Sequence, residues 1–246
     1  MSSNELRSRP FVAGGSMLMG FSLLWMLLAV GGSIFTLNPN QVDLHNILAG
    51  PNFDTWLGND HLGRAIFDRM VVGARTSFLV AVWVVTISLV VGTLVGALSA
   101  WWGGWADHVI VRIIDVFLAF PGMLLAIVLS GILGPGIENV VIALVLVGWV
   151  GFARLARAQT MSLKDREHVQ AALALGGGVP RILTYHIIPL ISAPLIVEAT
   201  FGIAGAVIAE AGLSFLGLGV QPPAASWGSM IRDGTRYMLV APHMVL

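Results

Sequence analysis

Few side chains in this sequence could carry out covalent or metal chemistry. The chain contains no cysteine, which excludes disulfides, thiolate metal sites and cysteine catalysis. Its six histidines are scattered and lack the spacing of metal ligands. The glycine-rich stretch GGGVPR lacks the lysine and hydroxyl residues of a phosphate-binding loop, and the pattern G-x-x-x-x-G-K-[ST] is absent. We therefore expect no catalytic residue, no metal site and no cofactor in this chain.

Composition places the chain in a membrane. Hydrophobic residues make up 57% of it and charged residues only 11%, with a mean hydropathy of +0.86. A soluble domain usually carries about 25% charged residues, so most of this surface must face something other than water. The formal net charge is zero, and nothing indicates nucleic acid as a ligand. The predicted fold class is an all-α polytopic protein of the lipid bilayer.

Three ionisable residues lie in or beside the apolar segments, where burial is costly and function is the default interpretation. Asp115 follows Arg112 by three residues, which favours an i, i+3 pair. Glu210 could cap the turn that follows its helix, and Glu198 could hydrogen-bond a neighbouring subunit. The two glutamates are twelve residues apart, about 120° of helix rotation, so they do not share a face.

A helix needs about 20 mostly apolar residues to cross a bilayer. Five segments meet or approach this length: 11–35, 76–106, 116–137, 139–153 and 187–215. The fourth is short and is the weakest of them. A sixth apolar segment begins at Tyr237 and stops at Leu246, so we expect about six spans, with the last one truncated rather than partly inserted.

These spans divide the chain into three regions. They are a cytoplasmic N-terminal tail with the first span (1–35), an extracytoplasmic loop (36–75), and a core (76–246) with a cytoplasmic loop at 158–189. The orientation follows from lysine and arginine, which fall more often in the segments assigned to the inside. In the outer loop we expect a short helix that places Arg64 and Asp68 at i, i+4.

The cytoplasmic loop has strong local signals. The stretch SLKD (162–165) matches a capping pattern and predicts a helix start. Three glycines (176–178) predict its end, and Pro180 suits the first turn of a second helix. Pro189 predicts a break or kink near the start of the last long span. The result is either a helix–hinge–helix unit or an ordinary connecting loop.

This loop resembles the cytoplasmic "EAA" loop of ABC-importer permeases, whose pattern is E-A-A, three residues, G, nine residues, then I-x-L-P. The sequence supplies Ala171, Ala172, Gly176 and Pro189 at that spacing, while Gln170, His186 and Ile188 replace the Glu, Ile and Leu. In that family the helix docks into a groove of a cytoplasmic ATPase subunit and transmits its motion. The resemblance therefore implies a coupling site formed by Gln170, Ala171, Ala172, Gly176, Gly177 and Pro189.

Two further stretches narrow the resemblance. GNDHLGRAIFDRMVVGARTSF (58–78) and EAGLSFLGLGVQPPAASWGSMI (210–231) are similar to inner-membrane permeases of dipeptide, oligopeptide and nickel importers, although Ala65 stands where that family commonly has Asp. Such permeases usually lie in the bacterial inner membrane and have six spans, with both termini on the cytoplasmic side. The resemblance also implies a second, homologous permease as heterodimer partner. Two cytoplasmic ATPase subunits, which bind the ATP and Mg, and an extracytoplasmic solute-binding protein complete the implied assembly.

The implied function is that of a permease subunit of an ATP-driven importer for dipeptides or oligopeptides, forming half of the translocation pathway. Glu198 and Glu210 are then pathway candidates. The irregular stretch after the last long span must be buried in protein or line a cavity, so we expect an outer-mouth loop containing Gly217, Gly219, Pro222, Pro223 and Trp227.

Other functions remain open at this stage. Nickel chelates or another small solute are alternative cargoes for the same kind of permease. A secondary transporter driven by an ion gradient, or a membrane scaffold without a pathway, would belong to different classes. Secondary transporters often contain internal repeats, and the sequence shows no clear repeat.

Overall fold

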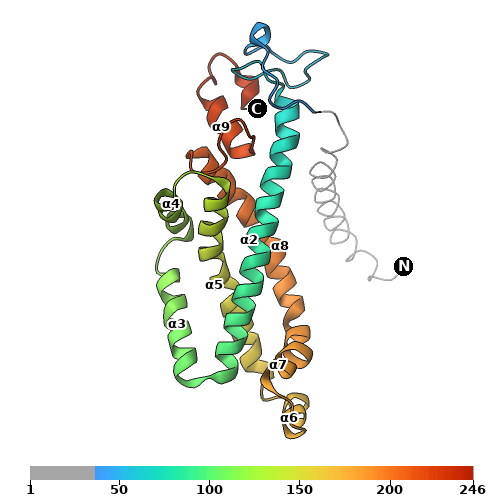
Figure 1. Cartoon of the computed structure of the whole chain (residues 1–246), viewed down its shortest axis with the longest axis vertical. Coiled ribbons are helices and arrows are strands. Elements are labelled where there is room, and N and C mark those ends of the chain that lie inside the picture. Colours follow the sequence, from blue (N-terminus) through green and yellow to red (C-terminus); the bar gives the residue numbers. More distant parts are fainter. Residues whose placement is uncertain (1–36, 246) are drawn as a thin grey trace, which may run out of the picture. The chain divides into compact units, whose positions relative to one another are not determined.

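A computed structural model describes residues 37–245, whose regular elements are all helices (Figure 1). The predicted tail and first span (residues 1–35) lie outside the described residues. The described residues form two compact units, residues 37–78 with 222–245 and residues 79–221. They are called the terminal unit and the central unit below. Helix α2 (Ile66–Trp102) begins in the terminal unit and ends in the central unit.

The remaining elements follow in chain order. They are η1 (Leu44–Asn46), α3 (Gly104–Leu118), α4 (Gly122–Leu133), α5 (Ile137–Leu163), α6 (Glu167–Ala174), α7 (Val179–Ile182), the π-helical η2 (Leu183–Ile187), α8 (Ile188–Phe215), α9 (Trp227–Thr235) and η3 (Pro242–Met244). Three helices of the described residues are long and apolar enough to cross a membrane: α2, α5 and the continuous helix Val179–Phe215. A bent pair, α3 with α4, gives a fourth candidate. The predicted all-α polytopic fold is confirmed.

The predicted span at 116–137 is wrong as a single straight helix. Helix α3 ends at Leu118, α4 begins at Gly122, and the two axes meet at 89°. Pro121 caps α4 with extended backbone, and a proline both lacks an N–H and disfavours helical backbone in the residue before it. The sequence is apolar on both sides of this proline, so hydropathy alone does not reveal the break.

Helix α5 is longer than the predicted fourth span at 139–153. It continues through Arg154 and Arg157 to Leu163, and arginine is a good helix former, so these charges limit the apolar length without ending the helix. The Arg157 guanidinium holds both carboxylate oxygens of Asp107 in α3, each at 2.6 Å. The predicted span 187–215 agrees closely with α8. Residues 237–245, where a sixth span is predicted to begin, form turns and the short helix η3.

The predicted second span at 76–106 also has different limits. Helix α2 begins at Ile66 and ends at Trp102, and Gly103, with φ +63°, separates it from α3. Two glycines bring the central part of α2 against α5. A Cβ on Gly96 would lie 2.1 Å from the carbonyl oxygen of Ala153, and one on Gly92 would lie 2.4 Å from that of Trp149. Such four-residue spacing of glycine is typical of closely packed membrane helices.

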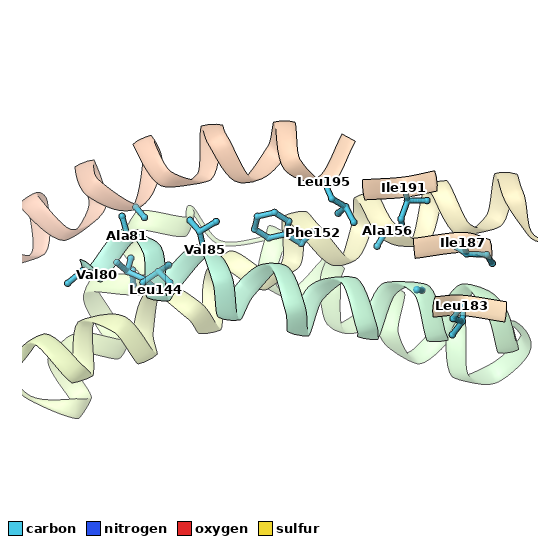
Figure 2. Packing of buried hydrophobic residues seen from close by; sticks show 14 of the residues in the cluster. Val80, Ala81, Val85, Leu144, Phe152, Ala156, Leu183, Ile187, Ile191 and Leu195 are labelled. Atoms are coloured by element: carbon cyan, nitrogen blue, oxygen red, sulfur yellow. The ribbon is translucent and has the colours of Figure 1, made fainter. Parts of the chain in front are cut away.

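The core of the central unit lies between α2, α5 and α8. Helix α5 packs against α3, α4 and α8. Figure 2 shows the buried hydrophobic side chains arranged along these helices, from Val80 and Leu144 at one end to Leu183 and Ile187 at the other. This packing extends to Leu183 and Ile187, within the predicted coupling loop (158–189), and it therefore fixes that end of the loop.

The terminal unit contains a buried carboxylate, that of Asp60, which pairs with two arginines. Asp60 accepts hydrogen bonds from Arg64, at 2.7 Å from Nε, and Arg69 Nε lies 3.6 Å from the same carboxylate. Burial alone raises the pKa of Asp60, but the hydrogen bonds from the Arg64 side chain and from the backbone N–H groups of Arg64 and Leu62 outweigh it, so the pKa is below its usual value. The carboxylate therefore stays charged and holds the loop against the first turn of α2.

The predicted pairing of Arg64 with Asp68 is wrong. Arg64 precedes α2, which begins at Ile66, so helical i, i+4 geometry does not apply to this pair. The side chain of Asp68 instead accepts a hydrogen bond from the backbone N–H of Asn38 at 3.0 Å. The pair that does form, Asp60 with Arg64, is buried rather than solvated.

Candidate functional site

Helix α6 lies in the predicted coupling loop (158–189) and projects from the end of the helices that carry it (Figure 1). It does not begin at the predicted capping stretch 162–165. Ser162 still belongs to α5, where its Oγ donates to the carbonyl of Gln159 at 2.8 Å. The N-cap of α6 is Arg166, whose extended backbone makes the corner without a side-chain cap. A hydroxyl within a helix can bond back to its own preceding turn, and this bond competes with a capping role.

One face of α6 is anchored in the core. Val169 is fully buried and belongs to the same hydrophobic cluster as Ile182 and Leu183. Ala172 and Val179 are half-buried and pack against this cluster. The anchor joins α6 to the beginning of the next helix, so the loop is attached on both sides of its glycines.

The predicted glycine end of α6 is confirmed. Gly176 has φ +82°, a left-handed conformation that favours glycine. Its N–H donates to the carbonyl of Leu173, and the N–H of Gly177 donates to the carbonyl of Ala172, both at 2.9 Å. This pair of bonds is a Schellman motif, which satisfies carbonyls that the helix end would otherwise leave unpaired.

The opposite face of α6 is open. Gln170, Ala171 and Gly176 are exposed, and Leu175 is 89% exposed at the very end of the helix. The side chain of Gln170, which stands where the resembling family has Glu, donates to the carbonyl of Lys164 at 3.0 Å. This hydrogen bond stabilises the turn between α5 and α6.

Two prolines follow the glycines. Pro180 lies in the first turn of α7, as predicted. Pro189 does not break the chain of helices, because α7, η2 and α8 form one continuous helix from Val179 to Phe215. The π-helical residues 183–187 change the helix type just before it, and the N–H of Ile188 bonds to the carbonyl of Leu183. This wider turn accommodates a residue that lacks an N–H and would crowd an α-helical carbonyl.

Contacts within the central unit show which segments share an end. The Lys164 ammonium donates to the carbonyl of Ala100 at 3.2 Å, so the end of α5 lies beside the end of α2. At the other end of α5, the N–H of Gly136 donates to the carbonyl of Leu218 at 3.0 Å. Helix α6 is thus on the side of the central unit opposite to the segment that follows α8.

A cavity of about 490 Å³ opens between α2, α4, α5 and α8 of the central unit. Its wall on α8 includes Glu198, Gly202, Gly205 and Ala209, which recur every three or four residues and so lie on one face of the helix. The cavity is mostly apolar, and Glu198 is the acidic residue among those that line it.

Glu210 occupies a different position, as its angular offset from Glu198 predicts. It is 1% exposed and accepts a hydrogen bond from Ser214 Oγ at 2.7 Å. The same Oγ accepts the N–H of Val220 at 3.2 Å. These bonds connect the last turns of α8 to the segment that follows it, in agreement with the capping alternative.

The residues of the predicted outer-mouth loop fall into both units. In the central unit, Gly217 has φ +88° and ends α8, while Gly219 is buried against Ser214. In the terminal unit, Pro222 and Pro223 are exposed. The carbonyl of Pro223 lies 3.4 Å from Arg69 Nη1, and the indole N–H of Trp227 donates to the carbonyl of Met70 at 3.1 Å. Each part is therefore held firmly within its own unit.

Some interactions could not be predicted from the sequence, and one that was predicted does not form. The Asp107–Arg157 pair joins residues 50 apart, and no local spacing indicates it. Arg112 and Asp115 form no ion pair with each other in the part of the chain that the structure describes. Among residues 37–245 there is no group of histidine, aspartate and glutamate side chains arranged to hold a metal ion.

The sequence matches a known family of membrane proteins. Residues 88–246 match the family model for the inner membrane component of binding-protein-dependent transport systems. The chain belongs to this family. The matched segment contains α6, the continuous helix Val179–Phe215 and most of the cavity wall.

Individual permeases are similar over most of the chain. The dipeptide transport system permease protein of Alkalihalophilus pseudofirmus is 44% identical over 82% of this chain and 66% of its own length. The glutathione transport system permease proteins of Pectobacterium atrosepticum and of Escherichia coli O6:K15:H31 are 40% and 42% identical over 84% of this chain, and over 69% and 68% of their own lengths. The chain thus spans about two thirds of these relatives.

Family membership establishes the general role of the chain. It is a multi-pass permease subunit of the inner membrane and a non-catalytic component of an ABC importer, which works with a solute-binding protein and separate ATP-hydrolysing subunits. Permease subunits of this family carry no cofactor of their own.

Proposed function

We propose that this permease is one half of an ATP-driven importer of short peptides, paired with a homologous permease and two ATPase subunits. The observation that carries the proposal is the open face of α6 with Leu175 at its end, inside the segment that matches the family. The names of the similar permeases, for dipeptides and for glutathione, support a peptide cargo.

The structure offers a route for transmitting a force from α6 to the membrane. Val169 joins α6 to the core residues Ile182 and Leu183, and the Schellman motif fixes the angle between α6 and the next segment. From Val179 onward the helix is continuous to Phe215. A displacement of α6 would therefore be passed directly to the start of a continuous helix.

The charge distribution supports a cytoplasmic position for α6. The end of the central unit that carries α6 holds several basic residues, namely Arg154, Arg157, Lys164, Arg166 and Arg181. Short loops rich in lysine and arginine remain on the cytoplasmic side of a membrane. With α6 inside, the segment after α8 faces the extracytoplasmic binding protein.

The coupling role is tested by crosslinking. Because the chain has no cysteine, Leu175→Cys introduces a single thiol at an exposed position, and an ATPase partner receives one cysteine in its groove. We expect a disulfide whose yield changes when ATP is added. Ile132→Cys is the matched control, since Ile132 is 78% exposed but lies at the end of α4, and it should give no crosslink. Equal crosslinking of the two variants, or crosslinking of Ile132→Cys alone, would overturn the assignment of α6.

The cargo is tested separately. The permease pair, the ATPases and the binding protein are reconstituted in proteoliposomes, and uptake of labelled dialanine is measured with and without ATP. ATP-dependent uptake is the expected result. An ATPase that is stimulated by the binding protein loaded with a nickel chelate, but not with dialanine, would keep the importer and overturn the peptide assignment.

A further inference from the structure

The cavity of the central unit contains two polar groups in an otherwise apolar wall. Glu198 projects from α8, and its Oε1 would lie 3.4 Å from a Cβ placed on Gly151 of α5. Ser88 projects from α2, and its Oγ would lie 2.8 Å from a Cβ placed on Gly148. Gly148 and Gly151 are three residues apart on one helix, so both polar groups lie over the same stretch of α5.

Neither polar group has a partner within the described residues. Glu198 is exposed in the protein itself and takes part in no ion pair there. Ser88 is 1% exposed, lines the cavity, and its Oγ has no hydrogen-bond partner among residues 37–245. A buried hydroxyl without a partner and a carboxylate without a cation are both costly in a membrane. Both costs fall if a ligand enters the cavity.

The chemistry of the missing ligand follows from what these groups can accept. A carboxylate is an acceptor only, and a hydroxyl can accept as well. An ammonium group has three N–H donors and a positive charge, and so satisfies both. The volume, about 490 Å³, lies within the range of about 300–1,000 Å³ that small-molecule sites occupy. The apolar remainder of the wall suits the uncharged part of a small solute.

We propose that Glu198 and Ser88 form a binding site for the ammonium group of the transported solute, which for a peptide is its amino terminus. The site deepens the proposed function and rests on it for the identity of the cargo. Gly202 and Gly205 keep the α8 wall low beside Glu198, and a Cβ on Gly205 would meet no atom within 4 Å. The glycines thus leave room for the solute next to the carboxylate.

The test uses the absence of cysteine from this chain. Ser88→Cys, or Gly205→Cys if the first variant fails to assemble, places one thiol in the cavity of the complete reconstituted importer. The thiol is treated with a thiosulfonate that carries a trimethylammonium group or with one that carries a sulfonate, and the labelled subunit is quantified by mass spectrometry. Rates are normalised to those of a free thiol. Each variant is repeated with Glu198→Gln and with the control Glu138→Gln, since Glu138 is an exposed glutamate outside this cavity.

We expect the cationic reagent to react about tenfold faster than the anionic one, because the carboxylate attracts the first and repels the second. Glu198→Gln should abolish this preference and Glu138→Gln should leave it unchanged. Dialanine should slow the labelling, whereas N-acetyl-dialanine, which lacks the ammonium group, should not. Loss of protection by dialanine in the Glu198→Gln variant would complete the assignment.

Three results would overturn the site: equal rates for the two reagents, a preference that survives Glu198→Gln, or no labelling of either thiol. Equal protection by dialanine and N-acetyl-dialanine would show that the site does not recognise the ammonium group. Failure of the proposed function is distinguished in the same proteoliposomes, because it would appear as an ATPase that dialanine-loaded binding protein does not stimulate. A charge preference observed together with that failure would retain a cation site and reject the peptide.

Discussion

Helices α6 and α8 end with the same backbone motif in opposite surroundings. At the end of α6, Gly176 and Gly177 donate to the carbonyls of Leu173 and Ala172. At the end of α8, Gly217 and Leu218 donate to the carbonyls of Ser214 and Leu213, at 3.0 Å each. Both ends are Schellman motifs with a left-handed glycine. The surroundings differ, because the α6 end projects Leu175 into the open while the α8 end is buried around Ser214.

The backbone motif therefore sets only the angle of a helix end, and the residues packed around it determine whether that end is buried or exposed. Around α8, the bonds from Ser214 to Glu210 and from Val220 to Ser214 fix the segment that follows. Around α6, Val169 and Ala172 pack on the core, whereas Leu175 at the end of the helix is exposed. Substitutions at the two ends should therefore separate stability from coupling.

Gly219→Ala should have the largest effect on stability. A Cβ at this position would lie 2.0 Å from Ser214 Oγ and 2.8 Å from Ser214 Cα, so the backbone itself must move. Overpacking of this kind costs roughly 1–3 kcal/mol, and we expect the upper end of that range because the bonds of Ser214 are disturbed as well. Thermal unfolding of the purified chain in detergent measures the change. An unfolding temperature equal to that of the wild type would show that the α8 end is not tightly packed.

Ser214→Ala should rank second. It removes the hydrogen bond to Glu210 and leaves the N–H of Val220 without its acceptor, which typically costs about 1–3 kcal/mol for buried groups. Thr200→Ala is the matched control, since its hydroxyl belongs to the same helix, is exposed, and bonds only to the carbonyl of Val197. The control should unfold within a degree or so of the wild type. Equal losses for the two variants would contradict a special role for Ser214.

Gly176→Ala should come third, at about 1 kcal/mol. A Cβ here would meet no atom within 4 Å, so the only cost is the left-handed backbone with φ +82°. Gly176→Ala therefore tests backbone strain without overpacking, whereas Gly219→Ala tests overpacking. A loss as large as that of Gly219→Ala would mean that the loop is more tightly packed than the described contacts indicate.

The same two ends show what could be predicted from the sequence. The glycine end of α6 was predictable because a left-handed residue acts locally. The separation of Glu198 from Glu210 followed from helical periodicity alone. What each glutamate faces was not predictable, since that depends on α5 and on the segment after α8.

Other features depended on residues far apart in the chain. The start of α6 moved to Arg166 because α5 continues beyond its charged residues. The extended part of α5 carries Arg157, which pairs with Asp107 from 50 positions earlier in the chain. Pro121 marks the bend in the sequence, but the prediction of a span at 116–137 rested on hydropathy, which does not change there.

Leu175→Ser should have the smallest effect on stability and a large effect on coupling. The side chain is 89% exposed, and surface substitutions usually change stability by less than about 0.5 kcal/mol. If α6 docks on an ATPase through this end, removal of the apolar side chain should lower the stimulation of ATP hydrolysis by loaded binding protein several-fold, because a central apolar anchor carries much of the binding energy of an interface. Ile132→Ser makes the same kind of change at an exposed isoleucine of α4, and it should alter neither the stability nor the stimulation of ATP hydrolysis. A stable Leu175→Ser variant with full stimulation would mean that the open end of α6 does not contact the ATPase. The only role left for α6 would then be structural, through the packing of Val169 in the core.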